Sequence, residues 1–365
     1  MIASITVSVV VPTYRRTVLL ERCLNALLSQ TFAPGDFEII IVDDGPESPE
    51  TRRLVETWQQ RLHDSYAILA PRVSKQVSVP VTGSAAGLFG QPVYEIRAAP
   101  MRFPELRYLP AWNTNGPAAA RNLGWQNARG QIIAFTDDDT IPDPNWLANG
   151  VAAFTGDIVG VSGRVIVPLS ERPTDNERNT THLERSHFVT ANCFYRRDAL
   201  EQAGGFDERF GMAWREDSDL FFTMQQRGWP LAWSSSAVVM HPVRPEKWGC
   251  SIKAQKKSYY NALLFKKHPA QYKKYIQARP PWHYYGMLLS LGAGIAGLLT
   301  GRNPMAKLGI ASWLALTARF ITNRLKGTSL APSHVAEMAL TSLVIPFLSI
   351  YWRLRGAIKW RVGFL

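Results

Sequence analysis

Three consecutive carboxylates, Asp137, Asp138 and Asp139, follow a short apolar run and are the strongest candidates for chemistry in this sequence. The run, residues 132–135, reads Ile-Ile-Ala-Phe, which is typical of a strand buried on both faces. Open α/β sheets bind ligands at the carboxyl ends of their strands. Because three adjacent negative charges repel one another, we expect a hard divalent cation there, Mg²⁺ or Mn²⁺, itself carrying a diphosphate. A solvated acidic turn before the next helix is the alternative.

A second carboxylate pair, Asp43 and Asp44, ends the apolar run at residues 37–42. Residues 5–11 form an earlier β-branched run, and residues 18–29 have the periodicity of a helix. These segments predict a βαβ unit of the nucleotide-binding type, with the two aspartates at the ligand edge of its sheet. The alternative is that they lie in a turn that caps the following helix.

Arg121 lies on a helix predicted at residues 118–128, which a Gly-Pro turn at residues 116–117 opens. Free backbone N–H groups at a helix amino terminus, together with a guanidinium, form an anion site. Arg121 is equally compatible with an exposed helical position.

Glu216 and Asp217 lie in the first turn of a helix predicted to run to Gln226, where the helix dipole favours carboxylates. Helix capping is the alternative role for both. His241 ends the strand predicted at residues 231–240. A lone histidine is usually structural, but one at this strand end can face the triple aspartate.

Several segments connect these candidates. Residues 70–110 are rich in Pro, Gly and Ala and are interpreted as an insertion, with a short strand possible at residues 106–110. Residues 158–167 predict another strand. The polar residues 170–185 predict a mobile loop.

Taken together, residues 5–242 resemble the family 2 glycosyltransferases, which are inverting, nucleotide-sugar-dependent enzymes with a GT-A fold. The resemblance depends on the order and spacing of six motifs: V-V-V-P-T-Y, I-I-I-V-D-D-G, G-P-A-A-A-R-N-L-G, F-T-D-D-D, A-N-C-F-Y-R-R followed by G-G-F-D-E, and W-R-E-D-S-D-L. It implies an α/β fold with a Rossmann-like, doubly wound mixed sheet.

The resemblance implies a donor site and a metal site. Pro12, Thr13 and Tyr14 match the segment that cradles the nucleotide in family members. Asp44 or Asp43 matches the carboxylate on the base or ribose, and Arg121 matches a basic residue near the diphosphate. The family's D-x-D motif falls on residues 137–139, with Asp139 as the main metal ligand and Asp137 and Asp138 on the donor side. His241 resembles a further metal or diphosphate ligand.

The resemblance also implies the base and the acceptor side. Asp217 matches the general base, with Glu216 beside it. The acceptor-side positions are Gly205, Phe206, Asp207 and Trp214. The chemistry agrees, because a base opposite the leaving group gives inversion in one displacement, without a second carboxylate as nucleophile. Two features depart from the family pattern: the long 70–110 segment, and Arg15-Arg16 where an asparagine is more usual.

Charge is unevenly distributed along the chain. Residues 1–240 carry 22 Lys and Arg against 27 Asp and Glu, whereas residues 241–365 carry 19 against 2. A basic tail contacts either an anionic membrane or nucleic acid, and the apolar runs between its basic clusters favour the membrane over nucleic acid. The three cysteines form no C-x-x-C pair, which argues against a zinc site and fits a reducing compartment.

We therefore predict three parts: a GT-A domain at 1–245, basic amphipathic interfacial helices at 246–280, and a hydrophobic helical membrane region at 281–365. The last part contains three apolar stretches, and we expect two crossings with both the catalytic domain and the basic end in the cytoplasm, at the inner membrane. A soluble helical subdomain is the alternative.

The predicted function is transfer of a sugar from a UDP-, GDP- or dTDP-linked donor to a cell-envelope glycan or lipid-linked acceptor. A polyprenyl-phosphate glycosyltransferase is the nearest alternative, and a catalytically inactive scaffold or binding protein is an alternative of another class. A sugar nucleotidyltransferase would need a Gly-rich, basic loop after the first strand, and a processive synthase a Q-x-x-R-W motif. Neither is present in the sequence.

Overall fold

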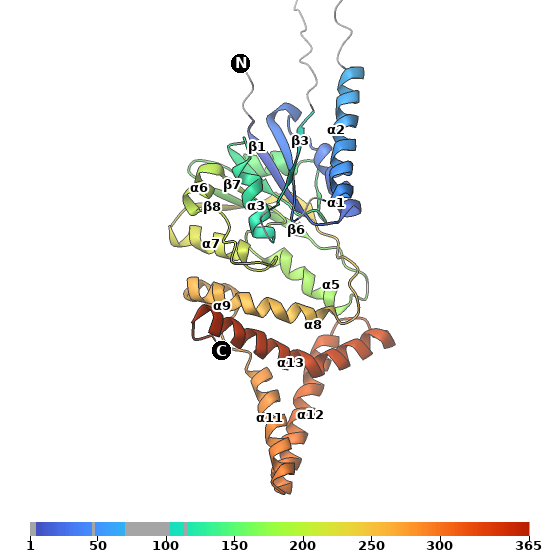
Figure 1. The fold of residues 1–365 in the computed structure, drawn as a ribbon, viewed down its shortest axis with the longest axis vertical. Helices are drawn as coiled ribbons and strands as arrows, with labels where there is room; N and C mark the ends of the chain where they lie inside the picture. The colour runs from blue at the N-terminus through green and yellow to red at the C-terminus, as the bar shows by residue number, and fades with distance from the viewer. Residues whose placement is uncertain (1–4, 46–47, 70–102, 113–115, 365) are drawn as a thin grey trace, which may run out of the picture.

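The computed structural model describes residues 5–45, 48–69, 103–112 and 116–364. Figure 1 shows an α/β sheet domain and, beneath it, a layer of helices that includes α9 (Ser258–Lys267) and α13 (Pro332–Trp360). A helical hairpin, α11 (Trp282–Leu299) and α12 (Asn303–Leu325), projects away from the body. The chain thus has a sheet domain and a helical region in contact with it.

The sheet has eight strands in the order β3-β2-β1-β4-β7-β6-β8-β5. Strands β1 to β4 are parallel, and β7 is antiparallel to both of its neighbours, β4 and β6. This confirms the predicted mixed sheet. The bounds are β1 Val7–Thr13, β2 Phe37–Asp43, β3 Glu105–Pro110, β4 Ile132–Phe135, β5 Ile141–Pro142, β6 Gly160–Ile166, β7 Cys193–Arg196 and β8 Leu231–Met240.

Helices cover both faces of the sheet because its central strands are apolar on both sides. Val9 and Ile39 point into one buried cluster, beneath α1, α2 and α4, while Val10 and Ile40 point into the other, beneath α3, α6 and α7. The helix bounds are α1 Thr17–Leu28, α2 Pro49–Leu69, α3 Pro117–Gln126, α4 Trp146–Ala152, α6 Arg197–Ala203 and α7 Glu216–Gln226, with a 3₁₀ turn at Pro34–Asp36.

Part of the predicted 70–110 insertion belongs to the sheet. Residues 70–102 lie outside the described residues, but β3 pairs with β2 over six residues and forms one edge of the sheet. The predicted short strand at residues 106–110 is therefore confirmed.

The prediction of a mobile loop at residues 170–185 was wrong. The segment contains α5 (Asp175–Thr180) and a 3₁₀ helix (Thr181–Arg185). Thr174 accepts a hydrogen bond from the backbone of Glu177, and the Glu177 carboxylate accepts one from the backbone of Thr174. This capping box stabilises the start of the helix.

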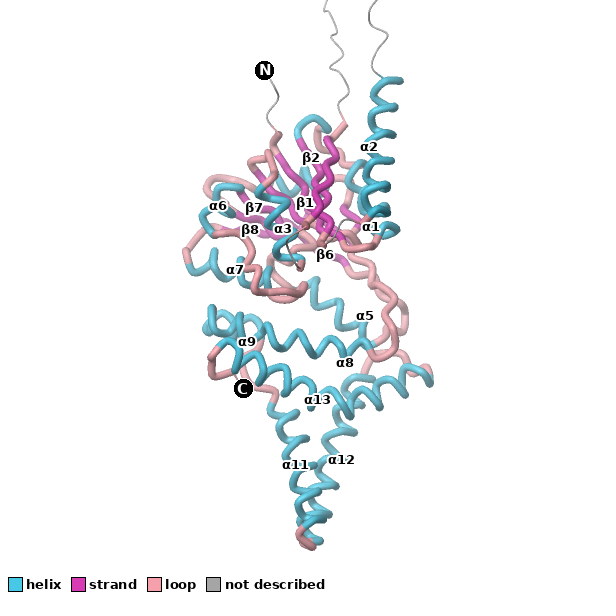
Figure 2. Tube along the Cα trace, in the orientation of Figure 1, coloured by secondary structure: helices cyan, strands magenta, loops and turns pink. Residues whose placement is uncertain are grey.

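The basic stretch after residue 245 packs against protein. Ala262, Leu263 and Leu264 of α9 (Ser258–Lys267) are buried in the same cluster as α7 residues of the sheet domain. The apolar face predicted to lie in a membrane interface is therefore covered at these positions by the sheet domain and α13. Figure 2 shows α8 and α9 running beside α13. The other elements of the helical region, apart from the hairpin, are α8 Cys250–Ala254, a 3₁₀ turn at Gln255–Lys257, α10 Pro269–Gln271, the π-helix η4 Tyr272–Ile276 and α13 Pro332–Trp360.

The two helices α11 (Trp282–Leu299) and α12 (Asn303–Leu325) form the projecting hairpin. Small residues let them approach closely: a Cβ on Gly297 would lie 2.4 Å from the backbone nitrogen of Ala306. The outward positions are apolar, and Leu289, Leu299 and Leu308 are each more than 70% exposed. By length and composition, one described helix, α13, qualifies as a membrane span.

Candidate active site

The three consecutive aspartates lie at the carboxyl end of β4, and each carboxylate pairs with a different arginine. Arg121 contacts Asp137 at 2.8 Å, Arg16 contacts Asp138 at 3.2 Å, and Arg244 contacts Asp139 at 3.0 Å (N···O distances). These contacts balance the mutual repulsion of the three charges. The solvated acidic turn is not what the structure has, since Asp138 and Asp139 are buried.

Asp137, Asp139 and His241 could hold a metal ion. One ligand atom from each lies within 4.8 Å of the others, and the Nε2 of His241 lies 3.6 Å from Asp139. His241 follows β8 directly, and its backbone N–H donates to Ile166 on the neighbouring strand β6. Two carboxylates and an imidazole are a donor set that suits Mn²⁺. The residues therefore fit the cation that the sequence predicts.

Asp138 is directed toward β1 instead. The hydroxyl of Thr13 donates to Asp138 at 2.8 Å, and burial raises the pKa of this carboxyl to about 6 against the influence of Arg16. Asp138 therefore ties the aspartate turn to the end of β1. Pro12 and Thr13 are buried there, while the following Tyr14 is 48% exposed and available to a ligand.

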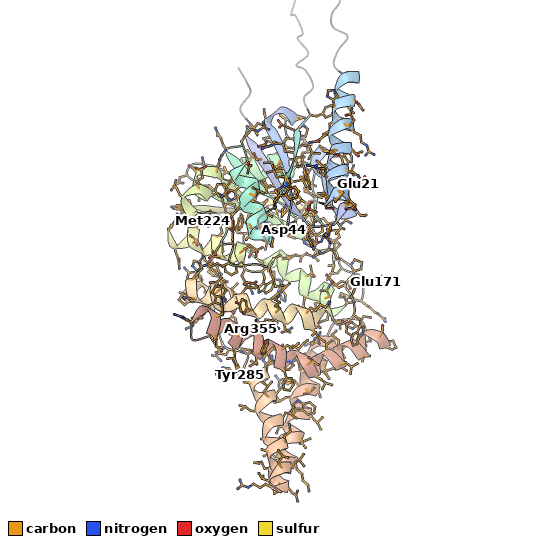
Figure 3. All side chains as sticks on the ribbon, in the orientation of Figure 1. Glu21, Asp44, Glu171, Met224, Tyr285 and Arg355 are labelled. Atoms are coloured by element: carbon orange, nitrogen blue, oxygen red, sulfur yellow. The ribbon has the colours of Figure 1, made fainter. Side chains whose placement is uncertain are left out.

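Asp43 and Asp44 lie at the end of β2, on the side of the sheet that faces the C-terminal helices, where Figure 3 labels Asp44. Asp43 is buried and accepts hydrogen bonds from the Ser48 backbone and the Tyr108 hydroxyl. Asp44 is half-buried and accepts one from the backbone of Gly116, and burial raises its pKa. Of the two carboxylates, Asp44 is therefore the more accessible to a nucleotide-sugar donor.

Arg121 joins two parts of the site that are distant in sequence. Its guanidinium is 3% exposed and contacts Glu216 at 2.9 Å as well as Asp137. It therefore links the first residue of α7 to the aspartate turn. The sequence predicts an open anion site at the start of α3. In the structure, the Arg121 guanidinium is instead already paired with the carboxylates of Asp137 and Glu216.

Glu216 and Asp217 begin α7, as predicted, but they face different surroundings. Glu216 is buried against Arg121, and burial together with Asp217 raises its pKa to about 7. Asp217 is half-buried and accepts hydrogen bonds from the backbone and hydroxyl of Ser218. Burial raises the pKa of Asp217 as well, so its carboxylate is more basic than an ordinary one.

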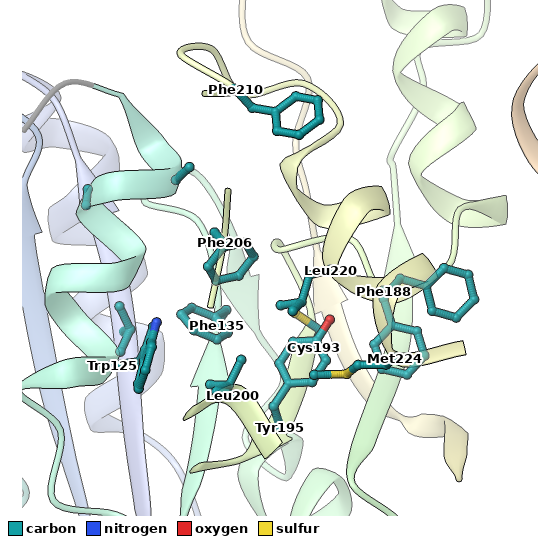
Figure 4. Close-up of a cluster of buried hydrophobic side chains, with 14 of the residues drawn as sticks. Trp125, Phe135, Phe188, Cys193, Tyr195, Leu200, Phe206, Phe210, Leu220 and Met224 are labelled. Atoms are coloured by element: carbon teal, nitrogen blue, oxygen red, sulfur yellow. The ribbon is translucent and has the colours of Figure 1, made fainter. Parts of the chain in front are cut away.

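The four predicted acceptor-side residues are mostly engaged with protein. Phe206 is 2% exposed and packs edge-on against Phe135 with ring centroids 5.1 Å apart, as Figure 4 shows. Phe206 therefore packs into the core, and its placement on the acceptor side stays a prediction. A Cβ on Gly205 would lie 2.6 Å from Asn122, so close packing explains this glycine. Asp207 pairs with Lys267 at 2.7 Å.

Trp214 is half-buried, three residues before Asp217, and the C-terminal helices hold it in place. Asn261 of α9 accepts hydrogen bonds from the Trp214 indole and the Arg215 guanidinium, both at 3.0 Å. Lys257 lies over the Trp214 ring, 4.6 Å from its centroid. Arg215, directly before α7, has a φ of 80°, a left-handed conformation that costs energy and is found at functional sites.

Sequence reasoning missed the roles of Arg16, Arg244 and Asn261. Arg16 was noted only as a departure from the family pattern. Arg244 follows His241 by three residues, so a cation shortly after a candidate metal ligand was an available signal. Asn261 lies in a helix 44 residues after Asp217 and had no sequence signal.

The chain is similar in sequence to known glycosyltransferases. Residues 8–72 and 94–215, about half of the chain, match the family described as Glycosyl transferase family 2. The glycosyltransferase AglE of Haloferax volcanii is 24% identical over 251 residues, covering 66% of this chain and 67% of the relative. A validoxylamine A glucosyltransferase of Streptomyces hygroscopicus subsp. limoneus is 47% identical over 149 residues, but these cover 41% of this chain and 24% of that protein.

The fold is also similar to a solved structure. The mannosyltransferase PcManGT from Pyrobaculum calidifontis, in complex with GDP-Man and Mn²⁺, aligns with a TM-score of 0.52 at 18% identity. The alignment covers 99% of this chain and 89% of the other. It therefore includes the C-terminal helices as well as the sheet domain.

Proposed function

The chain belongs to family 2 of the glycosyl transferases and is a nucleotide-sugar-dependent glycosyltransferase, and we propose that it transfers one sugar, with inversion, to an acceptor hydroxyl. The observation that carries this proposal is the Arg121 bridge. It places the helix turn that bears Asp217 directly beside the carboxylates that fit a cation. Base and leaving-group site are then held in one rigid unit.

Asp217 is the proposed general base. Its neighbour Glu216 is paired with Arg121, whereas Asp217 is half-buried, and among the described residues its side-chain hydrogen bonds are to Ser218, through Oδ1. Its raised pKa improves its ability to accept a proton from an acceptor hydroxyl as that hydroxyl attacks the anomeric carbon. Attack from the face opposite the leaving diphosphate inverts the configuration.

Asp137, Asp139 and His241 would hold the divalent cation, which supplies Lewis-acid stabilisation of the departing diphosphate. Arg16 and Arg244 support the same charge balance. Their side chains are 41% and 37% exposed, so both can turn from their aspartates toward phosphate oxygens. Tyr14 and Asp44 are the proposed contacts to the nucleoside.

We propose a membrane-bound acceptor because the site faces the C-terminal helices. The hairpin formed by α11 and α12 presents large leucines outward, at positions that would be unfavourable in water. Insertion of this hairpin into the cytoplasmic leaflet of the inner membrane would bring the site to lipid-linked or envelope glycans. The identity with the validoxylamine A glucosyltransferase supports a second candidate, a soluble small-molecule acceptor.

The test is a transfer assay on detergent-solubilised protein with Mn²⁺ and UDP-, GDP- or dTDP-linked sugars, using an extract of bacterial membrane lipids as acceptor. Nucleoside diphosphate release reports turnover, and NMR of the product reports the anomeric configuration. We expect inversion. A product with retained configuration would contradict the single displacement, and equal turnover with validoxylamine A in place of the lipid extract would favour the soluble acceptor.

A further inference from the structure

A cavity of about 760 Å³ opens on the sheet domain away from the carboxylates. It is lined by residues from β6 and β8, the carboxyl end of α7 and the π-helix η4. Helix α7 connects it to the active site, because Asp217 lies in the first turn and Gln225, which lines the cavity, lies in the last. Gln225 lies eight residues after Asp217, so this edge of the cavity is about 12 Å from Asp217 along the helix.

Aromatic side chains around this cavity are unusually accessible. Trp233 is 62% exposed and Tyr275 is 37% exposed, and His187 is exposed beside them. The His187 ring lies 5.7 Å from that of Phe221 and 6.1 Å from that of Tyr275. Aromatic groups gathered in a concave, solvent-open surface mark a binding site more often than a packing defect.

The floor of the cavity is held in an uncommon backbone conformation. Phe188 has a φ of 54°, and its backbone N–H donates to the hydroxyl of Ser162 at 3.0 Å. Its ring stacks on Phe221 with centroids 5.0 Å apart and an interplanar angle of 16°. A phenylalanine whose backbone has the left-handed conformation costs free energy, and residues with such backbone conformations cluster at catalytic and ligand-binding sites.

The polar groups of the cavity restrict the chemistry of a ligand. Gln225, Gln271 and Lys274 supply amide and ammonium groups, and the Gln225 amide lies 3.5 Å from the Tyr275 hydroxyl. The residues that line the cavity include no carboxylate. A neutral or anionic ligand with many hydroxyl groups and flat apolar faces fits this surface, because the aromatic rings cover its faces while the amides bond to its hydroxyls.

We propose that this cavity binds a glycan, namely a segment of the acceptor chain a few sugar units away from the hydroxyl that is glycosylated. This inference rests on the proposed function, because it takes the acceptor to be a glycan. Helix α7 then connects the chain-binding surface to the base. Binding remote from the reacting hydroxyl positions the acceptor end near Asp217 and selects long acceptors over short ones.

The experiment is native gel electrophoresis of the detergent-solubilised full chain in gels that contain dextran, mannan or polygalacturonate. We expect at least one polysaccharide to retard the wild-type protein. The double variant Trp233→Ala/Tyr275→Ala should bind it at least tenfold more weakly, equivalent to about 1.4 kcal/mol. Trp248→Ala, which removes a tryptophan that is 57% exposed outside the cavity, is the matched control and should bind normally.

Asp217→Asn and a donor-binding measurement separate the two proposals. Asp217→Asn should be retarded like the wild type, and loss of retardation would place the glycan at the active site and overturn the inference. Absence of retardation in all three gels would also overturn it. Nucleotide binding with Mn²⁺, measured on the same samples, tests the proposed function separately from the glycan site. The double variant should bind nucleotide as the wild type does, because its substitutions lie outside the carboxylate site.

Discussion

The sheet domain and the C-terminal helices differ in which side chains they bury. In the sheet domain, Asp138, Asp139 and Glu216 are buried together with Arg121, each in an ion pair, while the apolar residues fill two clusters on either face of the sheet. In the projecting hairpin, glycines such as Gly294 and Gly297 are buried and leucines lie outside.

This difference indicates two environments. Buried charges are stable only when paired, and the pairs in the sheet domain converge on one site, as chemistry on a charged substrate requires. Exposed leucines are less favourable in water than in a bilayer, so the hairpin supports the proposed contact with a membrane. The two regions meet at α9, where Asn261 bonds to Trp214 and Arg215, close in sequence to Asp217. We infer that the helices both support the site and orient it toward the membrane.

The largest expected effect tests the chemical side of the comparison. Asp217→Asn should lower kcat by at least about a thousandfold, within the range that a general base contributes, while the KM for the donor changes little. The measurement is steady-state release of nucleoside diphosphate. Asp157→Asn, which neutralises an exposed carboxylate, is the control and should retain full activity. Equal loss of donor binding in Asp217→Asn would contradict its role as the base.

The next effect tests the apolar side. Replacing Leu289, Leu298, Leu299 and Leu308 by Gln should reduce binding to vesicles of phosphatidylethanolamine and phosphatidylglycerol by at least about a hundredfold (~2.7 kcal/mol), a lower bound, since full burial of each of the four leucines contributes roughly 1.5–3 kcal/mol. Flotation of the protein with the vesicles measures this. Leu330→Gln, at a residue 69% exposed outside the hairpin, is the matched control. Unchanged flotation of the fourfold variant would show that the hairpin does not insert.

A third effect tests how the two regions are joined. Arg324 of α12 contacts Asp175 of α5 at 2.8 Å and the hydroxyl of Thr341 on α13 at 2.7 Å. Arg324→Ala removes the ion-pair partner of the partly buried Asp175. The free energy of unfolding should therefore fall by about 2 kcal/mol, which lowers the ratio of folded to unfolded protein roughly thirtyfold. Thermal or denaturant unfolding measures this. Arg319→Ala, on the exposed side of the same helix, should change stability by less than about 0.5 kcal/mol.

The smallest effect concerns pH. A base must be ionised to act, and burial raises the pKa of Asp217. The acid limb of the kcat profile should therefore lie above the ordinary aspartate pKa of about 3.9, with activity falling about tenfold per unit below it. Ser218→Ala, which removes a hydroxyl bonded to Asp217, should shift this limb further up, because that bond stabilises the ionised form. A limb that moves down in Ser218→Ala would contradict the assignment.

Local patterns predicted the strands and the carboxylates that end them. The apolar runs before Asp43 and Asp137 indicate buried strands, and such strands bring their carboxyl ends together. The GT-A fold followed from the order of the motifs. The capping box at Thr174 and Glu177 was also visible in the sequence, but the polarity of residues 170–185 led to the prediction of a mobile loop.

Long-range pairing accounts for what sequence reasoning could not find. Arg121 and Glu216 are 95 residues apart, and nothing local to either predicts their contact. Phe206 lies between a glycine pair and an acidic pair, which does not predict a core position, yet its ring fills a space next to Phe135. The burial of Leu263 and Leu264 similarly depends on α13, whose position the amphipathic pattern of α9 does not encode.

The most direct test of the central claim is nucleotide binding with and without Mn²⁺, followed by thermal unfolding of wild type and Asp139→Ala. UDP, GDP, dTDP and CMP are compared on detergent-solubilised protein. Asp139 and its partners would hold a cation that stabilises the diphosphate, so one nucleoside diphosphate should raise the wild-type Tm only when Mn²⁺ is present, and Asp139→Ala should show no such rise. A Tm rise that is independent of Mn²⁺, or that persists in Asp139→Ala, would contradict the metal site.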